Sequence, residues 1–198
     1  MKQTAKRISL SILIFAILLI AVLHIIARPA PPHPFFEQFD EYPLVIAHAG
    51  SELYPSDTLY ALEQYAEMGV DILEMDVNMT NDGHIVLIHD KTIDRTTDGT
   101  GKVSEMSLAE IQQYDAGYYW TNDEGETYPF RDLGIRIPTL QEVFETYPDY
   151  PMIIEIKQES PSMAGALCDL IKQYEMEDYV MVPSFSDVAI AEFREACP

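Results

Sequence analysis

The strongest constraint on the fold is an alternation of short apolar runs with helical stretches, which begins near Tyr42. The apolar runs typical of strands lie at 44–50, 71–80, 152–157 and 179–185. The stretches with helical signals lie at 57–68, from 139 onward, at 161–174 and at 187–196. Strands that alternate with helices predict parallel β/α units.

One connection breaks this alternation. Only Asn81, Asp82 and Gly83 separate the run that ends at Thr80 from the alternating run 84–90, which is far too short for a parallel crossover. Asp-Gly between alternating runs is typical of a hairpin. With Asp82-Gly83 as a two-residue loop, Asn81 pairs with His84. Asp76 then lies opposite His89, a register that a shift of one residue would change.

The segment 91–137 is long, turn-rich and aromatic, with one helical piece at 107–114. It is too long for an ordinary loop and indicates an inserted lid or subdomain. Two interpretations of its aromatic residues stay open, a surface that shapes selectivity or a small core of the lid itself. These residues are Tyr118, Tyr119, Trp120, Tyr128 and Phe130.

Residues 8–27 form an uncharged, apolar run of 20, long enough for a helix to cross a hydrocarbon core of about 30 Å. Three basic residues precede the run and only Arg28 follows it. This pattern predicts an uncleaved signal anchor, with a cytoplasmic basic tail at 1–7 and a single transmembrane helix at 8–27. A cleaved signal peptide is the alternative. We expect a proline-rich tether at 28–41 and a domain at 42–198 outside the cytoplasm, bound to the cell membrane through the helix.

The charge of the chain excludes one class of function. The formal net charge is −21, and all 33 acidic residues lie after residue 30. So negative a field repels polyanions, which excludes a nucleic-acid binder that works through basic contacts. The two cysteines, Cys168 and Cys197, either pair in an oxidising compartment or stay unpaired. The sequence does not indicate an oligomeric state.

Ionisable residues gather near the carboxyl ends of three predicted strands. Side chains alternate along a strand. Glu74 and Asp76 therefore lie on one face of the strand at 71–80, and Glu155 and Lys157 lie on one face of the strand at 152–157. In a parallel barrel these strand ends meet at the mouth. Three converging carboxylates repel one another unless a cation intervenes, and hard oxygen ligands suit Ca²⁺ or Mg²⁺. The alternative is a solvated strand end or an ion pair with Lys157.

Two histidines form a second set of candidate residues. His48 lies at the end of the first predicted strand, and His89 lies near the end of the hairpin arm. A lone histidine is more often a packing residue, and we assign that role to His33 and His84. Two imidazoles that titrate near neutrality on either side of a metal serve as general base and general acid.

These residues resemble the glycerophosphodiester phosphodiesterase family, relatives of the phosphatidylinositol-specific phospholipases C. The resemblance runs from about Leu44 to Pro198. The matching segments are AHAG at 47–50, PSDT at 55–58, GVDILEMDVNMTNDGHIVLIHD at 69–90, DRTTDGTG at 94–101, IPTL at 137–140, EIK at 155–157 and PSF at 183–185. Glu-x-Asp, then Thr-x-Asp-Gly and His-Asp, is a specific string.

The resemblance implies an α/β fold of the TIM (β/α)8 type and a phosphoric diester hydrolase activity. A glycerophosphodiester would give glycerol 3-phosphate and an alcohol, with Ca²⁺ or Mg²⁺. The glycerol hydroxyl would act as nucleophile, and water would then open a cyclic phosphate. The residues implied are His48 and His89 as catalysts, Glu74, Asp76 and Glu155 as metal ligands, and Lys157 facing the phosphate.

Two departures from the family pattern limit these expectations. Ala49 stands where the family usually has arginine, so no guanidinium clamps the phosphate there. Ser56 and Asp57 replace the usual Glu and Asn, which leaves the support of this loop open. Some relatives carry His-Ala-Gly, so Ala49 does not by itself imply inactivity.

The chain also holds only the N-terminal portion of a barrel, four clear strands plus the hairpin, where a closed barrel takes about 250 residues and eight strands. We expect 42–198 to be C-terminally incomplete. The alternative functions are a truncated or degenerate noncatalytic membrane protein, or a related enzyme acting on a lysophospholipid or phosphoinositide headgroup.

Overall fold

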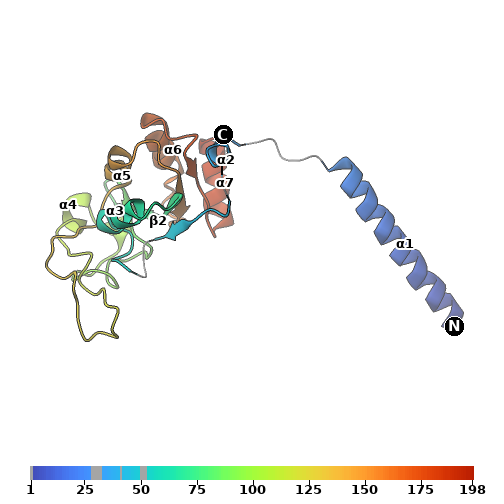
Figure 1. Ribbon diagram of the computed structural model, residues 1–198, viewed down its shortest axis with the longest axis horizontal. Coiled ribbons are helices and arrows are strands. Elements are labelled where there is room, and N and C mark those ends of the chain that lie inside the picture. Colours follow the sequence, from blue (N-terminus) through green and yellow to red (C-terminus); the bar gives the residue numbers. More distant parts are fainter. Residues whose placement is uncertain (1, 28–32, 41, 50–52) are drawn as a thin grey trace. The chain divides into compact units, whose positions relative to one another are not determined.

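The computed structural model describes residues 2–27, 33–40, 42–49 and 53–198, with side chains from residue 12 onward. The chain divides into two units, Met1–His33 and Pro34–Pro198. The first unit contains helix α1 (Lys2–Ile26) (Figure 1). Within the described residues, no helix combines the length and the apolar character needed to cross a membrane. The transmembrane helix expected at 8–27 is therefore not found among the described residues, and the expected membrane attachment stays a prediction.

Parts of the N-terminal predictions fall outside the described residues. They are the side chains of the expected cytoplasmic tail (1–7), those of residues 8–11 of the expected span, and residues 28–32 and 41 of the expected tether. The second unit begins at Pro34, earlier than the boundary expected at 42. Helix α2 (Pro34–Glu37) belongs to this unit, and its Phe35 is fully buried.

The second unit is built on one five-stranded sheet. Strands β1 (Ile46–His48), β2 (Ile72–Met79), β4 (Met152–Ile156) and β5 (Val180–Met181) run parallel in the order β1-β2-β4-β5, and β3 (Ile85–Leu87) pairs antiparallel with β2. The helices are α3 (Leu59–Glu67), α4 (Leu108–Ile111), α5 (Leu140–Thr146), α6 (Ala164–Gln173) and α7 (Asp187–Ala196), with a 3-10 turn at Val103–Glu105. The predicted parallel β/α units are confirmed.

The main core lies between the sheet and its helices. On β2, Leu73, Met75 and Val77 are fully buried and pack in one cluster with Leu62 of α3 and Phe144 of α5. Alternation along the strand turns Glu74 and Asp76 to the other face. Apolar burial on one face therefore fixes the direction of the carboxylates on the other.

The hairpin is confirmed, but the predicted register is wrong by one residue. Met79 pairs with Ile85 and Val77 with Leu87, and the Ile88 amide donates to the Asp76 carbonyl at 2.9 Å. Asp76 thus lies opposite Ile88, not His89. The physical reason is a three-residue loop, 81–83, which Gly83 closes with φ +88° in the left-handed region that favours glycine.

The lid at 91–137 has an aliphatic core of its own. Val103, Ile111 and Ile137 are buried there together with Val86 and Ile88 of the hairpin arm. Tyr114 packs against this cluster, whereas the five aromatic residues at 118–130 are not part of it. Phe130 makes edge contacts with Tyr60 at 5.3 Å and Trp120 at 4.8 Å between ring centroids. The lid is therefore a packed subdomain, and most of its aromatic residues lie outside its aliphatic core.

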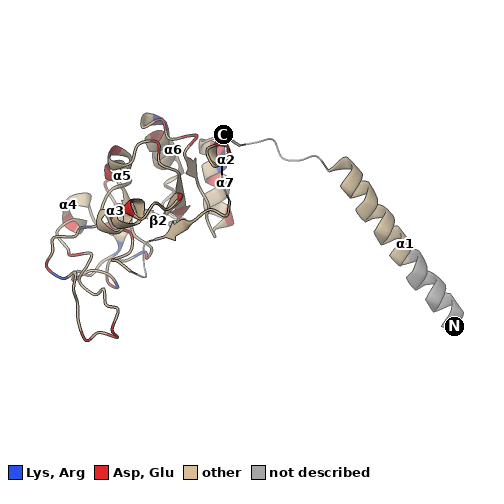
Figure 2. Cartoon of the chain, in the orientation of Figure 1, with Lys and Arg blue, Asp and Glu red and all other residues tan. Residues whose placement is uncertain are grey.

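Acidic side chains are spread over the helices and loops of the second unit (Figure 2). Two of them take part in capping boxes at helix N-termini. Thr139 and Glu142 form a capping box at the start of α5, and Ser107 and Glu110 form another at α4. Each box satisfies backbone amides that a helix start leaves without partners. Part of the excess negative charge thus stabilises local structure.

A disulfide joins Cys168 of α6 to Cys197, just beyond α7, across 29 residues of sequence. The structure thus decides between the two states left open for these cysteines. Cross-linking restricts the unfolded chain and ties α7 to α6.

Reduction should therefore lower the free energy of unfolding of the full chain by about 3 kcal/mol. Urea denaturation with and without reductant measures this. The doubly substituted Cys168→Ser, Cys197→Ser variant is the control, and its stability should not respond to the reductant. Equal stability of the oxidised and reduced wild type would contradict the prediction.

Candidate functional site

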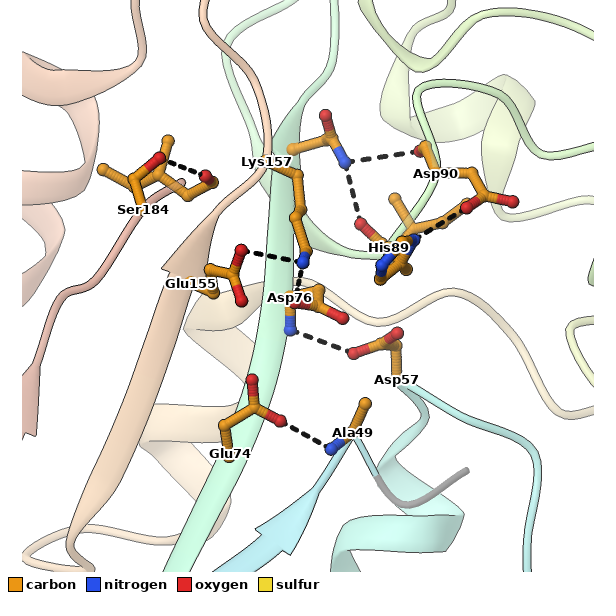
Figure 3. Close-up of polar contacts among 12 residues, drawn as sticks. Ala49, Asp57, Glu74, Asp76, His89, Asp90, Glu155, Lys157 and Ser184 are labelled. Carbon is orange, nitrogen blue, oxygen red and sulfur yellow. Dashed lines mark hydrogen bonds and ion pairs between the residues drawn. The ribbon is translucent and has the colours of Figure 1, made fainter. Parts of the chain in front are cut away.

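Two parallel strands, β2 and β4, bring the predicted carboxylates together, and β1 places His48 next to them. In the β1–β2 pair His48 lies beside Glu74, and in the β2–β4 pair Asp76 lies beside Glu155. One ligand atom from each of Glu74, Asp76 and Glu155 lies within 4.8 Å of the others (Figure 3). The convergence expected from strand alternation is confirmed.

The carboxylate cluster is almost dry. Glu74, Asp76 and Glu155 are 5%, 1% and 8% exposed. Burial raises the pKa of Glu74 and of Asp76 above its usual range, and in Glu74 the charge of Asp76 adds to this effect. Among the described residues, Asp76 Oδ2 has no hydrogen-bond partner. Buried carboxylate oxygens without partners are costly unless they meet a cation, so these three residues fit a divalent metal ion.

Lys157 places one positive charge against this cluster. Its Nζ lies 2.8 Å from Glu155 Oε1 and 3.1 Å from Asp76 Oδ1. Burial lowers the pKa of the ammonium group, but hydrogen bonds and the charges of Glu155 and Asp76 outweigh this effect and raise it. The ion pair with Lys157, which was the alternative interpretation of these carboxylates, is thus present. It still leaves Asp76 Oδ2 without a hydrogen-bond partner among the described residues.

Asp57 is a buried residue of the site whose role the sequence left open. Its Oδ1 accepts the Asp76 amide at 3.0 Å, and its own amide donates to the Ala49 carbonyl at 2.9 Å. Burial raises the pKa of Asp57 well above its usual range. Asp57 therefore ties the loop after β1 to the metal-facing part of β2, which answers how this loop is supported.

Ala49 contributes its backbone. With φ +49° it turns its amide toward Glu74, which accepts it through Oε2 at 2.6 Å and through the backbone carbonyl at 3.1 Å. Both Ala49 and Asp57, with φ +56°, occupy the left-handed region, which is strained for residues with a side chain. Two strained residues therefore contact the Glu74 carboxylate and the Asp76 backbone.

The two predicted histidines lie near different members of the cluster. His48 is exposed at the end of β1, and its charge acts on Glu74, while the charge of His89 acts on Asp76. Buried Asn78 donates to the carbonyls of Ile88 and Asp90 at 2.8 and 3.3 Å. This holds the segment that carries His89 against β2.

His89 has partners that sequence reasoning missed. Its Nδ1 lies 2.8 Å from Asp90 Oδ1, and the Arg95 Nε donates to Asp90 Oδ2 at 2.5 Å. The hydrogen bond from Arg95 lowers the pKa of Asp90. An ionised Asp90 orients the ring and leaves Nε2 available for proton transfer. In the sequence, the adjacency of His89 and Asp90 is the signal from which this contact could have been predicted.

A parallel β/α sheet with an acidic cluster at its strand ends, accompanied by two histidines, is typical of a TIM-barrel-like fold whose carboxylates could hold a divalent metal ion. Residues 48–189 match the model described as the Glycerophosphoryl diester phosphodiesterase family, so the chain belongs to this family.

Two relatives show how much of the family the chain covers. A glycerophosphodiester phosphodiesterase of Caldanaerobacter subterraneus subsp. tengcongensis is 39% identical over 161 residues, which are 78% of this chain and 63% of the relative. One of Bacillus subtilis (strain 168) is 30% identical over 78% of this chain and 56% of the relative. The chain thus spans less than two thirds of these curated relatives.

Solved structures agree on the fold. A phosphodiesterase of Oleispira antarctica, in complex with the product sn-glycerol-3-phosphate, is 31% identical, with TM-score 0.66 over 77% of this chain and 62% of that one. A glycerophosphodiester phosphodiesterase of Agrobacterium tumefaciens str. C58 is 27% identical, with TM-score 0.69 over 78% of this chain and 63% of that one. The TIM-barrel-like fold expected from the sequence is confirmed.

The raised pKa values predict how stability depends on pH. Carboxyl groups of the unfolded chain ionise near about pH 4, whereas folded Glu74 and Asp76 keep their protons to higher pH. The folded state then binds more protons, so this contribution to the free energy of unfolding falls as pH rises above about 4. Bound Mg²⁺ or Ca²⁺ should restore it.

Asp76→Asn isolates this contribution, because the amide stays neutral. We expect the variant to gain stability over the wild type as pH rises from about 4 to about 7 in the presence of a chelator, measured by urea denaturation. Mg²⁺ should stabilise the wild type and not the variant. A stability difference independent of pH would contradict the assignment.

The Asp57 contacts predict an effect on cation binding. Asp57→Gly keeps the left-handed backbone but removes the acceptor for the Asp76 amide, and should weaken Mg²⁺ or Ca²⁺ binding by about tenfold or more. Asp57→Asn keeps an acceptor and should retain most of the affinity. Isothermal titration of the full chain measures both. Equal losses in the two variants would show that the charge of Asp57, and not its hydrogen bond, matters.

Proposed function

We propose that the chain hydrolyses glycerophosphodiesters to glycerol 3-phosphate and an alcohol in a reaction that depends on a divalent metal. The observation that carries this proposal is the buried cluster of Glu74, Asp76 and Glu155, with His48 and His89 near it. The names of the relatives, and the product in the Oleispira antarctica complex, support the substrate class.

The three carboxylates would hold Ca²⁺ or Mg²⁺, both of which prefer oxygen ligands. When bound, the ion supplies Lewis-acid stabilisation of phosphoryl charge. Lys157 adds a fixed positive charge beside it, at 2.8 Å from Glu155. With Ala49 in place of arginine, the phosphate has no guanidinium to clamp it at this position, so Lys157 is the basic side chain that faces it.

The histidines would carry the protons. One imidazole takes the proton of the glycerol hydroxyl as its oxygen forms a bond to phosphorus. The bond from phosphorus to the leaving oxygen breaks, and that oxygen takes a proton from the other imidazole. Water then opens the cyclic phosphate with the two proton transfers reversed. Asp90, whose Oδ1 lies 2.8 Å from His89 Nδ1, holds the ring in place.

We also propose that the second unit works in an oxidising compartment outside the cytoplasm. The Cys168–Cys197 disulfide supports this location, because such bonds persist where thiols are not kept reduced.

His48→Ala tests the activity. With glycerophosphocholine and Mg²⁺ or Ca²⁺, the full chain should release glycerol 3-phosphate, and a chelator should abolish the release. His48→Ala should lower kcat by about 100-fold or more, the usual contribution of a general acid or base. His84→Ala, just after the hairpin loop and away from the cluster, is the matched control and should be unaffected. Undiminished activity of His48→Ala would overturn the mechanism.

A further inference from the structure

The pairing between β2 and the hairpin arm opens at Asp76, a residue of the carboxylate cluster. The Ile88 amide donates to the Asp76 carbonyl at 2.9 Å. In a regular antiparallel pair, the Asp76 amide would donate back to the Ile88 carbonyl. It donates instead to Asp57 Oδ1 at 3.0 Å (Figure 3). The Ile88 carbonyl therefore needs a donor from another group, because a buried backbone oxygen without a partner is costly.

The side chain of Asn78 supplies that donor. Its Nδ2 donates to the Ile88 carbonyl at 2.8 Å and to the Asp90 carbonyl at 3.3 Å. Within the part of the chain that the structure describes, no backbone amide donates to either carbonyl. Asn78 is 1% exposed, so bulk water has little access to its amide. One buried side chain thus holds the backbone on both sides of His89.

The contacts of Asn78 differ in kind from the contacts of the His89 ring. Asp90, which meets Nδ1 at 2.8 Å, is the next residue along the chain and orients the ring within its own loop. Asn78 belongs to β2 (Ile72–Met79), the strand that also carries Glu74 and Asp76. It therefore connects the loop of His89 to the strand of the cluster, beyond the end of β3 at Leu87.

We propose that Asn78 is a positioning residue for catalysis, which holds His89 at a fixed place relative to the carboxylate cluster. The inference rests on the proposed function, in which His89 transfers a proton, and adds a residue to its machinery. Proton transfer requires the imidazole within hydrogen-bond reach of the reacting oxygen. A small displacement of the His89 backbone therefore lowers kcat.

Asp57 and Asn78 then divide the support of the opened pair between them. Asp57 accepts the amide of Asp76, on the side of the metal ligands, and Asn78 donates to the carbonyl of Ile88, on the side of His89. Asn78 is not among the residues proposed to hold the cation or the phosphate. Its loss should therefore lower kcat and leave cation affinity and KM unchanged, in contrast to Asp57→Gly.

Hydrolysis of glycerophosphocholine by the full chain tests the proposal. Asn78→Leu keeps a side chain of similar size without a donor, and should lower kcat by about 10- to 100-fold with unchanged KM and Mg²⁺ affinity. Asn81→Leu is the matched control. Asn81 Nδ2 also donates to a backbone carbonyl, that of Glu105 at 3.1 Å, but in the hairpin loop, and its loss should leave kcat unchanged. An unchanged kcat in Asn78→Leu, or an equal loss in Asn81→Leu, would overturn the proposal.

A double-mutant cycle separates positioning from a purely structural role. In a His89→Ala background, Asn78→Leu should have little further effect on kcat, because the residue through which it acts is gone. The same fold loss in both backgrounds contradicts the proposal. If Asn78→Leu does not fold, Asn78→Ser takes its place in the cycle with the same two outcomes, because its short hydroxyl cannot bridge both carbonyls.

Nuclear magnetic resonance of the full chain, labelled with ¹³C in its histidines, separates failure of this inference from failure of the proposed function. If the wild type hydrolyses no diester, the proposed function fails. Asn78→Leu should still shift the ring signals of His89 and leave those of His48 in place. Unchanged His89 signals, or equal shifts of both histidines, would reject the positioning role whether or not a diester is hydrolysed.

Discussion

Mutual repulsion among buried carboxylates is the constraint on which the site depends. Glu74, Asp76 and Glu155 lie within 4.8 Å of one another in a nearly dry environment, where charges are poorly screened. Lys157 compensates part of this charge. The apolar faces of β2 and β4 stabilise the arrangement from behind, so the fold supplies the free energy that holds unfavourable groups in place.

Backbone hydrogen bonds support the carboxylate cluster at a position where the chain has no arginine side chain. Ala49 supplies no guanidinium, but its amide contacts Glu74, and its carbonyl accepts the Asp57 amide. Asp57 in turn reaches Asp76. A continuous set of hydrogen bonds therefore runs from the end of β1 to the metal-facing residues of β2, with left-handed residues at both turning points.

The sequence predicted the carboxylate cluster because strand periodicity is local and exact in its alternation. The parallel units and the hairpin followed from connection lengths. The hairpin register did not, since Asp82-Gly83 is compatible with loops of two or three residues. The contact of Asp57 with Asp76 depends on tertiary packing between two segments, and the contact of Arg95 with Asp90 depends on the path of the loop between them, which no simple periodicity predicts. The N-terminal apolar run predicted a membrane span; no such helix is found among the described residues, which leave out the side chains of residues 8–11.

The separate aliphatic core of the lid has a consequence for divergence within such a family. Substitutions on the outer surface of the lid need not disturb packing behind the catalytic strands, because the two clusters share no buried residue. Sequence changes can then accumulate in the lid while the carboxylate cluster stays constant. A division of this kind lets two parts of one unit diverge at different rates.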